Sequence, residues 1–236
     1  MAIDWTKPPS FEEIINDKEI QSAFSKKYTE CYIKDEINLF TNLNHELNML
    51  DPLIERLKTI GVDLNSYPWY KDLCDIYIPK ATQHFNKVID KSNKCDIVKE
   101  DETWFRESSD AFFSNVEKFT KFIVLEIFGK KPKDWNDAIE NLNNIKMDNI
   151  IKSKFDNDQE LNKIIDYVVF TLHQWRMLYN ANKHDTTKEK NSVLKKQKES
   201  TIIFNGNDIL DLTHEFVNII YLLLPFVLLI KSTKNT

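Results

Sequence analysis

The chain has 236 residues, of which 42% are hydrophobic and 29% are charged, and its formal net charge is −5. This balance is typical of a folded globular protein and excludes a disordered chain. The net negative charge excludes a protein that binds nucleic acid through an overall basic surface, although a local basic patch can still attract a polyanion. With only 3 Gly and 7 Pro, the composition favours long helices over the frequent turns of an all-β fold.

Cysteine usage and the apolar segments indicate the compartment. Cys31, Cys74 and Cys95 are an odd number of widely spaced cysteines without a C-x-x-C pair. We therefore expect neither a structural zinc site nor a disulfide framework, but reduced thiols in a cytoplasmic protein. The first residues, "MAIDWTKPPSFEEI", do not have the pattern of a secretory signal. The most apolar stretch, 219–230, is shorter than the ~20 residues that cross a bilayer, so we expect a buried helix and no membrane anchor.

The first third of the chain has helical spacing of its apolar residues. Ser10 and Glu13 form a capping box that predicts the start of a first helix. Asp51 and Pro52 then predict a new helix start, and Gly61 predicts its end. The run 67–90 is helical as well, with a kink or break expected at Pro79.

Beyond a polar connection at 91–101 the helical pattern becomes cleaner. A helix is predicted to stop at Gly129, and Asp134 is the expected N-cap of the next one. Asn207 or Asp208 is expected to cap a last helix that runs through Ile230. We trust no strand pattern apart from the short "TIIF" at 201–204. The remaining predicted segments are a short segment at 147–155, a long helix at 157–184 and a polar loop at 185–200. The fold class is therefore all-α.

The long predicted helix carries a row of polar residues at steps of four. Arg176, Asn180 and His184 lie along one border of its apolar stripe, because a four-residue step drifts by only ~40° around a helix. His173 falls on the same border. A side chain at such a border can be held by packing and still meet a ligand. The expected core-facing stripe consists of Leu161, Ile165, Val168, Leu172, Trp175 and Tyr179.

These residue types suit the cleavage of RNA without a metal ion. A histidine can exchange a proton with the ribose 2′-OH near neutral pH, and an arginine can bind a phosphate with two hydrogen bonds. An asparagine can orient the imidazole or donate to an oxyanion. We find no carboxylate cluster for a metal nuclease and no cofactor motif. The lysines expected to contact the RNA backbone are Lys183, Lys188 and Lys190.

Around these residues the chain resembles the HEPN superfamily of small helical bundles, many of which are RNases of toxin–antitoxin and phage-defence systems. The resemblance rests on the "R-x3-N-x3-H" motif of Arg176, Asn180 and His184, and on the order of the helices around it. It covers roughly residues 100–232. It implies a HEPN-like antiparallel helical bundle at 99–236, preceded by an N-terminal helical region of unknown role at 1–98.

The resemblance also implies a homodimer in which two motif helices form a composite RNase site, with RNA as substrate and an antitoxin or regulatory protein as partner. The chain differs from the commoner active pattern, because Tyr179 replaces an arginine directly before Asn180 and seven residues separate Arg176 from His184. Three hypotheses follow. The first is a metal-independent endoribonuclease, the second a non-catalytic helical module that binds a partner protein or nucleotide, and the third a structural subunit. A polar helix border without function would carry the same residue types.

Overall fold

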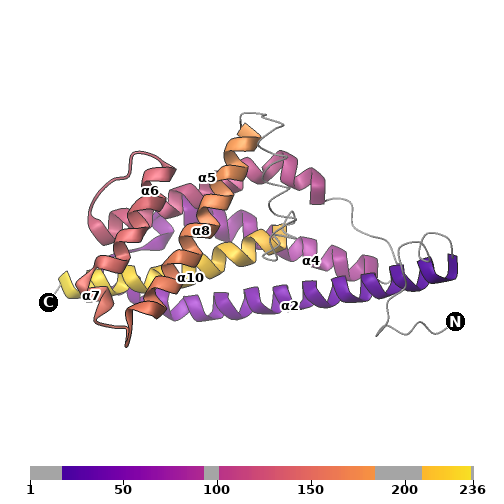
Figure 1. Cartoon of the computed structure of the whole chain (residues 1–236), viewed down its shortest axis with the longest axis horizontal. Coiled ribbons are helices and arrows are strands. Elements are labelled where there is room, and N and C mark those ends of the chain that lie inside the picture. The colour runs from indigo at the N-terminus through magenta and orange to yellow at the C-terminus, as the bar shows by residue number, and fades with distance from the viewer. Residues whose placement is uncertain (1–17, 93–100, 184–208, 235–236) are drawn as a thin grey trace.

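The computed structural model describes residues 18–92, 101–183 and 209–234, and within these ranges the chain is all-α, without a strand, as the sequence predicts. Figure 1 shows the helices as an elongated bundle in which α2 (Lys18–Thr59) runs along one side and extends past the others. Several predicted features lie outside the described residues: the capping box Ser10–Glu13, the loop 185–200, the segment 201–204 and the cap at Asn207 or Asp208.

Helix α2 is continuous through Pro52, so the helix start predicted at Asp51 is wrong. A proline inside a helix removes one backbone hydrogen bond. Leu50 and Leu57, which are 2% and 0% exposed, anchor α2 in the core on both sides of the proline and offset this loss. The predicted end at Gly61 is confirmed, since this glycine has a φ of +88° and its N–H donates to the Lys58 carbonyl.

The next helical run changes its winding before Pro79. After the 3₁₀ turn η1 (Leu64–Ser66), α3 (Pro68–Asp72) passes into a π-helical turn, η2 (Leu73–Tyr77), and then into α4 (Ile78–Ser92). The run is therefore not broken at Pro79. The wider turn directly before the proline accommodates the backbone position that lacks an N–H donor.

The middle of the chain follows the predicted boundaries closely. Helix α5 (Asp101–Phe128) ends at Gly129, which has a φ of +67°. Asp134 caps α6 (Trp135–Leu142) by accepting a hydrogen bond of 2.9 Å from the N–H of Asp137. The 3₁₀ turn η3 (Asn143–Met147) and α7 (Asn149–Lys152) then lead into α8 (Asp158–Lys183).

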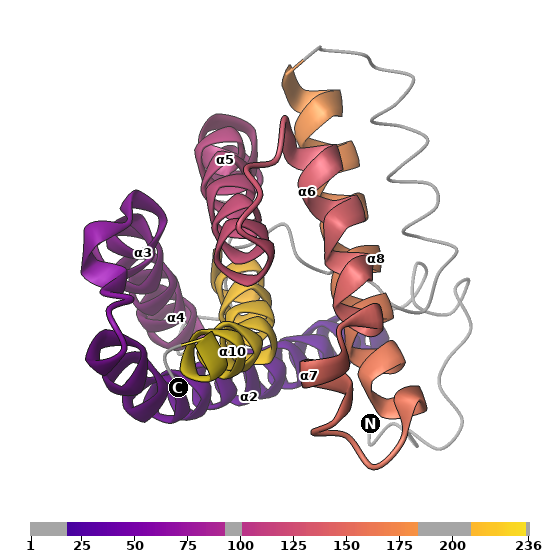
Figure 2. The ribbon, with the colours of Figure 1, turned by 90° about the vertical axis from the view of Figure 1, so that its left-hand side faces the viewer.

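The last helix, α10 (Ile209–Lys234), lies at the centre of the molecule, as predicted from its apolar residues. It packs most extensively against α2 and also contacts α4, α5 and α7, an arrangement visible in Figure 2. Phe112 of α5, Trp175 of α8 and Phe216 of α10 join their helices in one aromatic core, in which the Phe112 ring lies 5.7 Å from each of the other two. The N-terminal helices therefore share a single core with the rest of the chain.

Candidate functional site

Helix α8 presents the apolar stripe that its sequence predicts. Leu161, Ile165, Val168, Leu172 and Trp175 are all 0% exposed, which fixes the rotation of the helix in the bundle. Tyr179 is partly buried and packs edge-to-face on Trp135 of α6, with ring centroids 5.8 Å apart. This contact explains an aromatic residue at position 179.

The border of α8 next to α6 brings together two of the three predicted catalytic residues. Arg176 and Asn180 lie one turn apart, ~6 Å along the axis, and both are partly exposed. His184 directly follows the last residue of α8 and lies outside the described residues, as do Lys188 and Lys190. Lys183 is the last helical residue, and only its backbone is described. We call the row of His173, Arg176 and Asn180 the α8 border row.

The electrostatics of the α8 border row favour an anionic ligand. Within the described part of the chain, Arg176 has no carboxylate within 4 Å, so its guanidinium is not neutralised by an ion pair there. Partial burial and the charge of Arg176 lower the pKa of His173, while Glu140 of α6 opposes this shift. His173 is consequently a neutral imidazole at pH 7, and the positive charge of the row comes from Arg176.

A neighbouring face of α8 exposes large apolar side chains. Phe170 is 51% exposed, and Tyr167 and Met177 are each 37% exposed. Residues three or four positions apart on a helix are neighbours, so Tyr167 and Phe170 belong to one surface, which Met177 continues two turns further along.

A second group of polar side chains is buried where α2 meets α4 and α10. His84 Nε2 of α4 lies 3.6 Å from Glu36 Oε2 of α2, and these residues are only 6% and 3% exposed. Ten residues after Glu36 on α2, Glu46 Oε1 lies 3.4 Å from His214 Nε2 of α10. His84 has no such partner near it in the sequence, because Glu36 comes from a distant part of the chain.

Acidic residues of α10 extend this group towards α8. Tyr167 donates its hydroxyl hydrogen to Glu215 Oε1, and Asn218 Nδ2 donates to the Tyr167 oxygen over 3.1 Å. Asp211 lies one turn before Glu215, close enough to Glu36 for their charges to interact. We call the following set the buried cluster, in which Glu36 and His84 are buried and the others are partly buried: Glu36, Glu46, His84, Asp211, His214 and Glu215. Tyr167, which is 37% exposed, bounds this cluster at the surface.

The buried cluster was not predicted from the sequence, although the spacing of three polar residues in the last helix indicates it. Asp211, His214 and Glu215 are spaced i, i+3 and i+4 on a helix that is otherwise strongly apolar. This spacing places them on one face, and a polar face on a buried helix requires partners.

The described residues hold no group of three or more His, Cys, Asp or Glu side chains placed to bind a metal ion. The two Glu–His pairs of the buried cluster are separated by ten residues of α2, or ~15 Å. The cluster contains two separate Glu–His contacts, each an ion pair when the imidazole is protonated, and Glu215 accepts a hydrogen bond from Tyr167.

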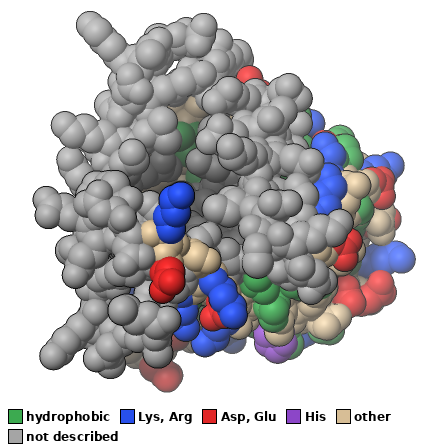
Figure 3. All heavy atoms as spheres, turned by 90° about the vertical axis from the view of Figure 1, so that its right-hand side faces the viewer, with side chains coloured by type: hydrophobic (Ala, Val, Ile, Leu, Met, Phe, Trp, Pro, Cys, Tyr) green, Lys and Arg blue, Asp and Glu red, His purple; other side chains and the backbone are tan. Residues whose placement is uncertain are grey.

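Two surface properties bear on partners. In the part of the chain that the structure describes, α10 is long and apolar enough to cross a membrane, but half of its most apolar window is buried against other helices, as in a core helix. Figure 3 shows one end of the molecule, where described basic and acidic side chains lie next to one another.

Comparison of the chain with protein-family models, with curated proteins and with solved structures gives no match.

Proposed function

We propose that this chain is a metal-independent endoribonuclease of toxin or phage-defence type, built on a HEPN-like helical bundle. The observation that carries the proposal is Arg176, a partly exposed guanidinium without an ion pair among the described residues, one turn from Asn180 on a helix anchored in the core. The enzyme would act in the cytoplasm as a homodimer, with an antitoxin or regulatory protein as its partner.

Each residue of the motif has a role in this reaction. His184 accepts the proton of a ribose 2′-OH, and the 2′ oxygen attacks the adjacent phosphorus. The bond to the 5′ oxygen breaks and that oxygen takes up a proton from the His184 imidazolium or from water, which leaves a 2′,3′-cyclic phosphate and a fragment with a 5′-OH. Arg176 binds the phosphate oxygens through its planar fork, and Asn180 orients the imidazole. Lys183, Lys188 and Lys190 bind flanking phosphates.

Cleavage of single-stranded RNA in excess EDTA tests the proposal. We expect fragments that end in a 2′,3′-cyclic phosphate. His184→Ala should lower the rate by about two to four orders of magnitude, the usual contribution of a positioned general acid or base. Arg176→Ala should also lose activity, and Arg176→Lys should recover little of it, because a point charge does not replace two parallel hydrogen bonds.

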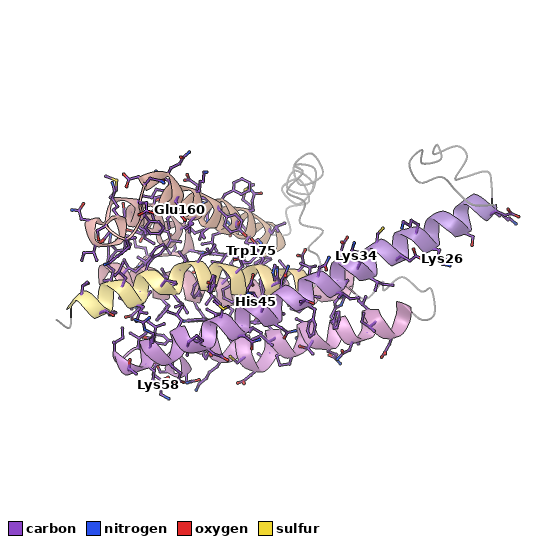
Figure 4. The ribbon with its side chains drawn as sticks, turned by 90° about the horizontal axis from the view of Figure 1, so that it is seen from below. Lys26, Lys34, His45, Lys58, Glu160 and Trp175 are labelled. Atoms are coloured by element: carbon purple, nitrogen blue, oxygen red, sulfur yellow. The ribbon has the colours of Figure 1, made fainter. Side chains whose placement is uncertain are left out.

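Two matched variants test whether losing any arginine or any histidine lowers activity, because they remove these residue types outside the motif. Arg56 and His45 are exposed on α2, a different helix from that of the α8 border row, and Figure 4 shows His45 on that helix. Arg56→Ala and His45→Ala should cleave like the wild type, and the melting temperatures of all variants should agree within a few degrees. If the wild type cleaves no RNA, or if His184→Ala cleaves as fast as the wild type, the nuclease proposal fails.

The exposed apolar face of α8 favours a second candidate, a non-catalytic module that binds a partner protein. Helix-in-groove binding uses side chains spaced like Tyr167, Phe170 and Met177. Light scattering helps to separate the two candidates. A homodimer agrees with a composite nuclease site, whereas a strict monomer at high concentration, together with inactivity towards RNA, would favour the module.

A further inference from the structure

A short turn rich in lysine joins α5 to α6. Its residues 129–133 include three lysines and no acid, and we call Lys130, Lys131 and Lys133 the basic turn. All three side chains are exposed, and among the described residues none of them forms an ion pair. The whole chain has a net charge of −5, so the basic turn is a local exception to the charge of the molecule. Such an exception can attract an anionic ligand, because steering depends on the local potential.

The backbone of the basic turn is fixed at both ends. Gly129 ends α5 with a φ of +67°, and Pro132 is buried. The N–H of Lys133 donates to Asp137 Oδ2 over 2.8 Å, and the N–H of Asp137 donates to Asp134 over 2.9 Å. These hydrogen bonds tie the turn to the first residues of α6. The lysine side chains therefore project from a backbone of defined position.

The two aspartates that follow the basic turn do not neutralise it. Their carboxylates accept backbone N–H groups, Asp134 as the cap of α6 and Asp137 from Lys133. This hydrogen bond, together with the charges of Lys130 and Lys133, lowers the pKa of Asp137, so both aspartates are ionised at pH 7. The start of a helix carries about half a positive elementary charge. Three ammonium groups and the start of α6 therefore exceed the two carboxylates.

The basic turn ends beside the α8 border row. Trp135 packs edge-to-face on Tyr179, with ring centroids 5.8 Å apart, and Tyr179 directly precedes Asn180. Lys133 is two residues before Trp135, and two residues span at most about 7 Å. Figure 2 shows the start of α6 next to the end of α8. Lys133 therefore lies at the Asn180 end of the row.

The other end of the row faces an acid. Helices α6 and α8 run in opposite directions, as Figure 2 shows, so residues later in α6 lie beside residues earlier in α8. Glu140 is exposed on α6, five residues or ~7.5 Å after Trp135, and its charge acts on His173. The charge along the junction thus changes from acidic beside His173 to basic at Asn180. An anionic chain bound at Arg176 meets favourable charge in the direction of the basic turn.

We propose that the basic turn binds the phosphate backbone of a single-stranded RNA that leaves the α8 border row past Asn180. Arg176 binds a phosphate within the row, and the three lysines bind further phosphates of the same strand. Lysine ammonium groups contact the backbone as point charges and read no base. This role rests on the proposed function, because RNA is the ligand in both, but binding without cleavage tests it separately.

A phosphate chain fits the basic turn better than an acidic protein does. The core of a protein–protein interface consists of large apolar and aromatic side chains. Between Gly129 and Asp134 the apolar residue is Pro132, which is buried. The exposed apolar side chains of α8, such as Phe170, belong to a different helix. The surface of the turn therefore offers charge without an apolar core.

The test is the salt dependence of binding to a 2′-O-methyl single-stranded RNA, which lacks the nucleophile. Fluorescence anisotropy measures the affinity at several salt concentrations. Each phosphate contact contributes about 0.7 to the slope of log affinity against log salt concentration. The triple variant Lys130→Gln/Lys131→Gln/Lys133→Gln should therefore reduce the slope by about 2, and each single variant by about 0.7.

A matched triple variant removes the same charge from another helix. Lys18→Gln/Lys26→Gln/Lys34→Gln changes three exposed lysines in the N-terminal part of α2. Figure 1 shows this part of α2 and helix α6 at opposite ends of the molecule. The α2 variant should leave the slope unchanged. The melting temperatures of the wild type and of both triple variants should agree within a few degrees, because all six side chains are exposed.

The outcomes separate the basic turn from the nuclease. If the wild type cleaves RNA but the basic-turn variant keeps the wild-type slope, the role of the turn is wrong and the nuclease proposal stands. If the slope falls by about 2 and the wild type cleaves no RNA, the turn is a binding surface and the nuclease proposal fails. A wild type that binds no RNA overturns both proposals.

Two further results would overturn the role of the basic turn alone. Equal reductions of the slope by the two triple variants would show that RNA responds to the overall charge of the protein. Binding of polyglutamate that depends on the three lysines, with binding of RNA that does not, would assign the turn to an acidic protein partner.

Discussion

The α8 border row and the buried cluster both combine a histidine with charged side chains, but in opposite surroundings. In the row, Arg176 is partly exposed and has no ion pair among the described residues, so its charge is available to a ligand. In the cluster, Glu36 and His84 are almost completely buried and paired with one another. A charge satisfied by another helix contributes to structure, whereas an unsatisfied charge at a surface border marks a site where a ligand can bind.

The largest effect on stability is expected in the buried cluster. Glu36→Ala should lower the free energy of unfolding by about 3 kcal/mol at pH 6, because it leaves His84 buried without its carboxylate. Urea unfolding measures this loss. Glu30→Ala removes an exposed glutamate of the same helix and should cost about 0.5 kcal/mol or less, since surface ion pairs such as that with Lys27 contribute little.

The double variant Glu36→Ala/His84→Ala sharpens this prediction. If the two residues stabilise α2 through their mutual contact, the double variant should lose less than the sum of the two single variants. Equal losses for Glu36→Ala and Glu30→Ala would mean that the buried pair does not stabilise the junction, and the contrast between the two regions would disappear.

Sequence reasoning succeeds where structure is decided by neighbouring residues. Gly129 and Asp134 terminate and start helices through their own backbone and side-chain hydrogen bonds, so both boundaries could be predicted. The apolar stripe of α8 follows from helical spacing alone. Pro52 was misinterpreted because its local effect is overcome by the burial of leucines against distant helices.

The site could be predicted only in part for the same reason. Arg176 and Asn180 share a helix, so their common border follows from their spacing. Glu36 and His84, or Glu46 and His214, meet only because α2, α4 and α10 pack together. No regular spacing along the chain connects such pairs.

An intermediate effect is expected where α8 packs on α6. Tyr179→Arg should cost about 2 kcal/mol, because it removes the edge-to-face contact with Trp135 and places a charge at a partly buried position. Urea unfolding provides the measurement, and Tyr179→Phe, which keeps the ring, is the matched control. Tyr179→Arg also places an arginine directly before Asn180, the order of the HEPN pattern that the proposed function invokes. A gain of RNase activity would therefore identify the row as a decayed site.

The smallest effect on stability is expected for Arg176→Ala, and it separates ligand binding from structure most clearly. The side chain is partly exposed and has no ion pair in the described part of the chain, so the free energy of unfolding should change by about 0.5 kcal/mol or less. The affinity of the Arg176→Ala variant for RNA should nevertheless fall, because one phosphate contact is lost.

Binding of a 2′-O-methyl single-stranded RNA, which lacks the nucleophile, isolates that contact from cleavage. Each phosphate contact contributes about 0.7 to the slope of log affinity against log salt concentration, so Arg176→Ala should reduce the slope by roughly that amount. Arg56→Ala, which removes the same charge from an exposed position on α2, should leave the slope unchanged. If both arginine variants reduce the slope equally, RNA is attracted by overall charge and the α8 border row is not its binding site. A large loss of stability in Arg176→Ala would instead show that the row, like the buried cluster, holds the fold together.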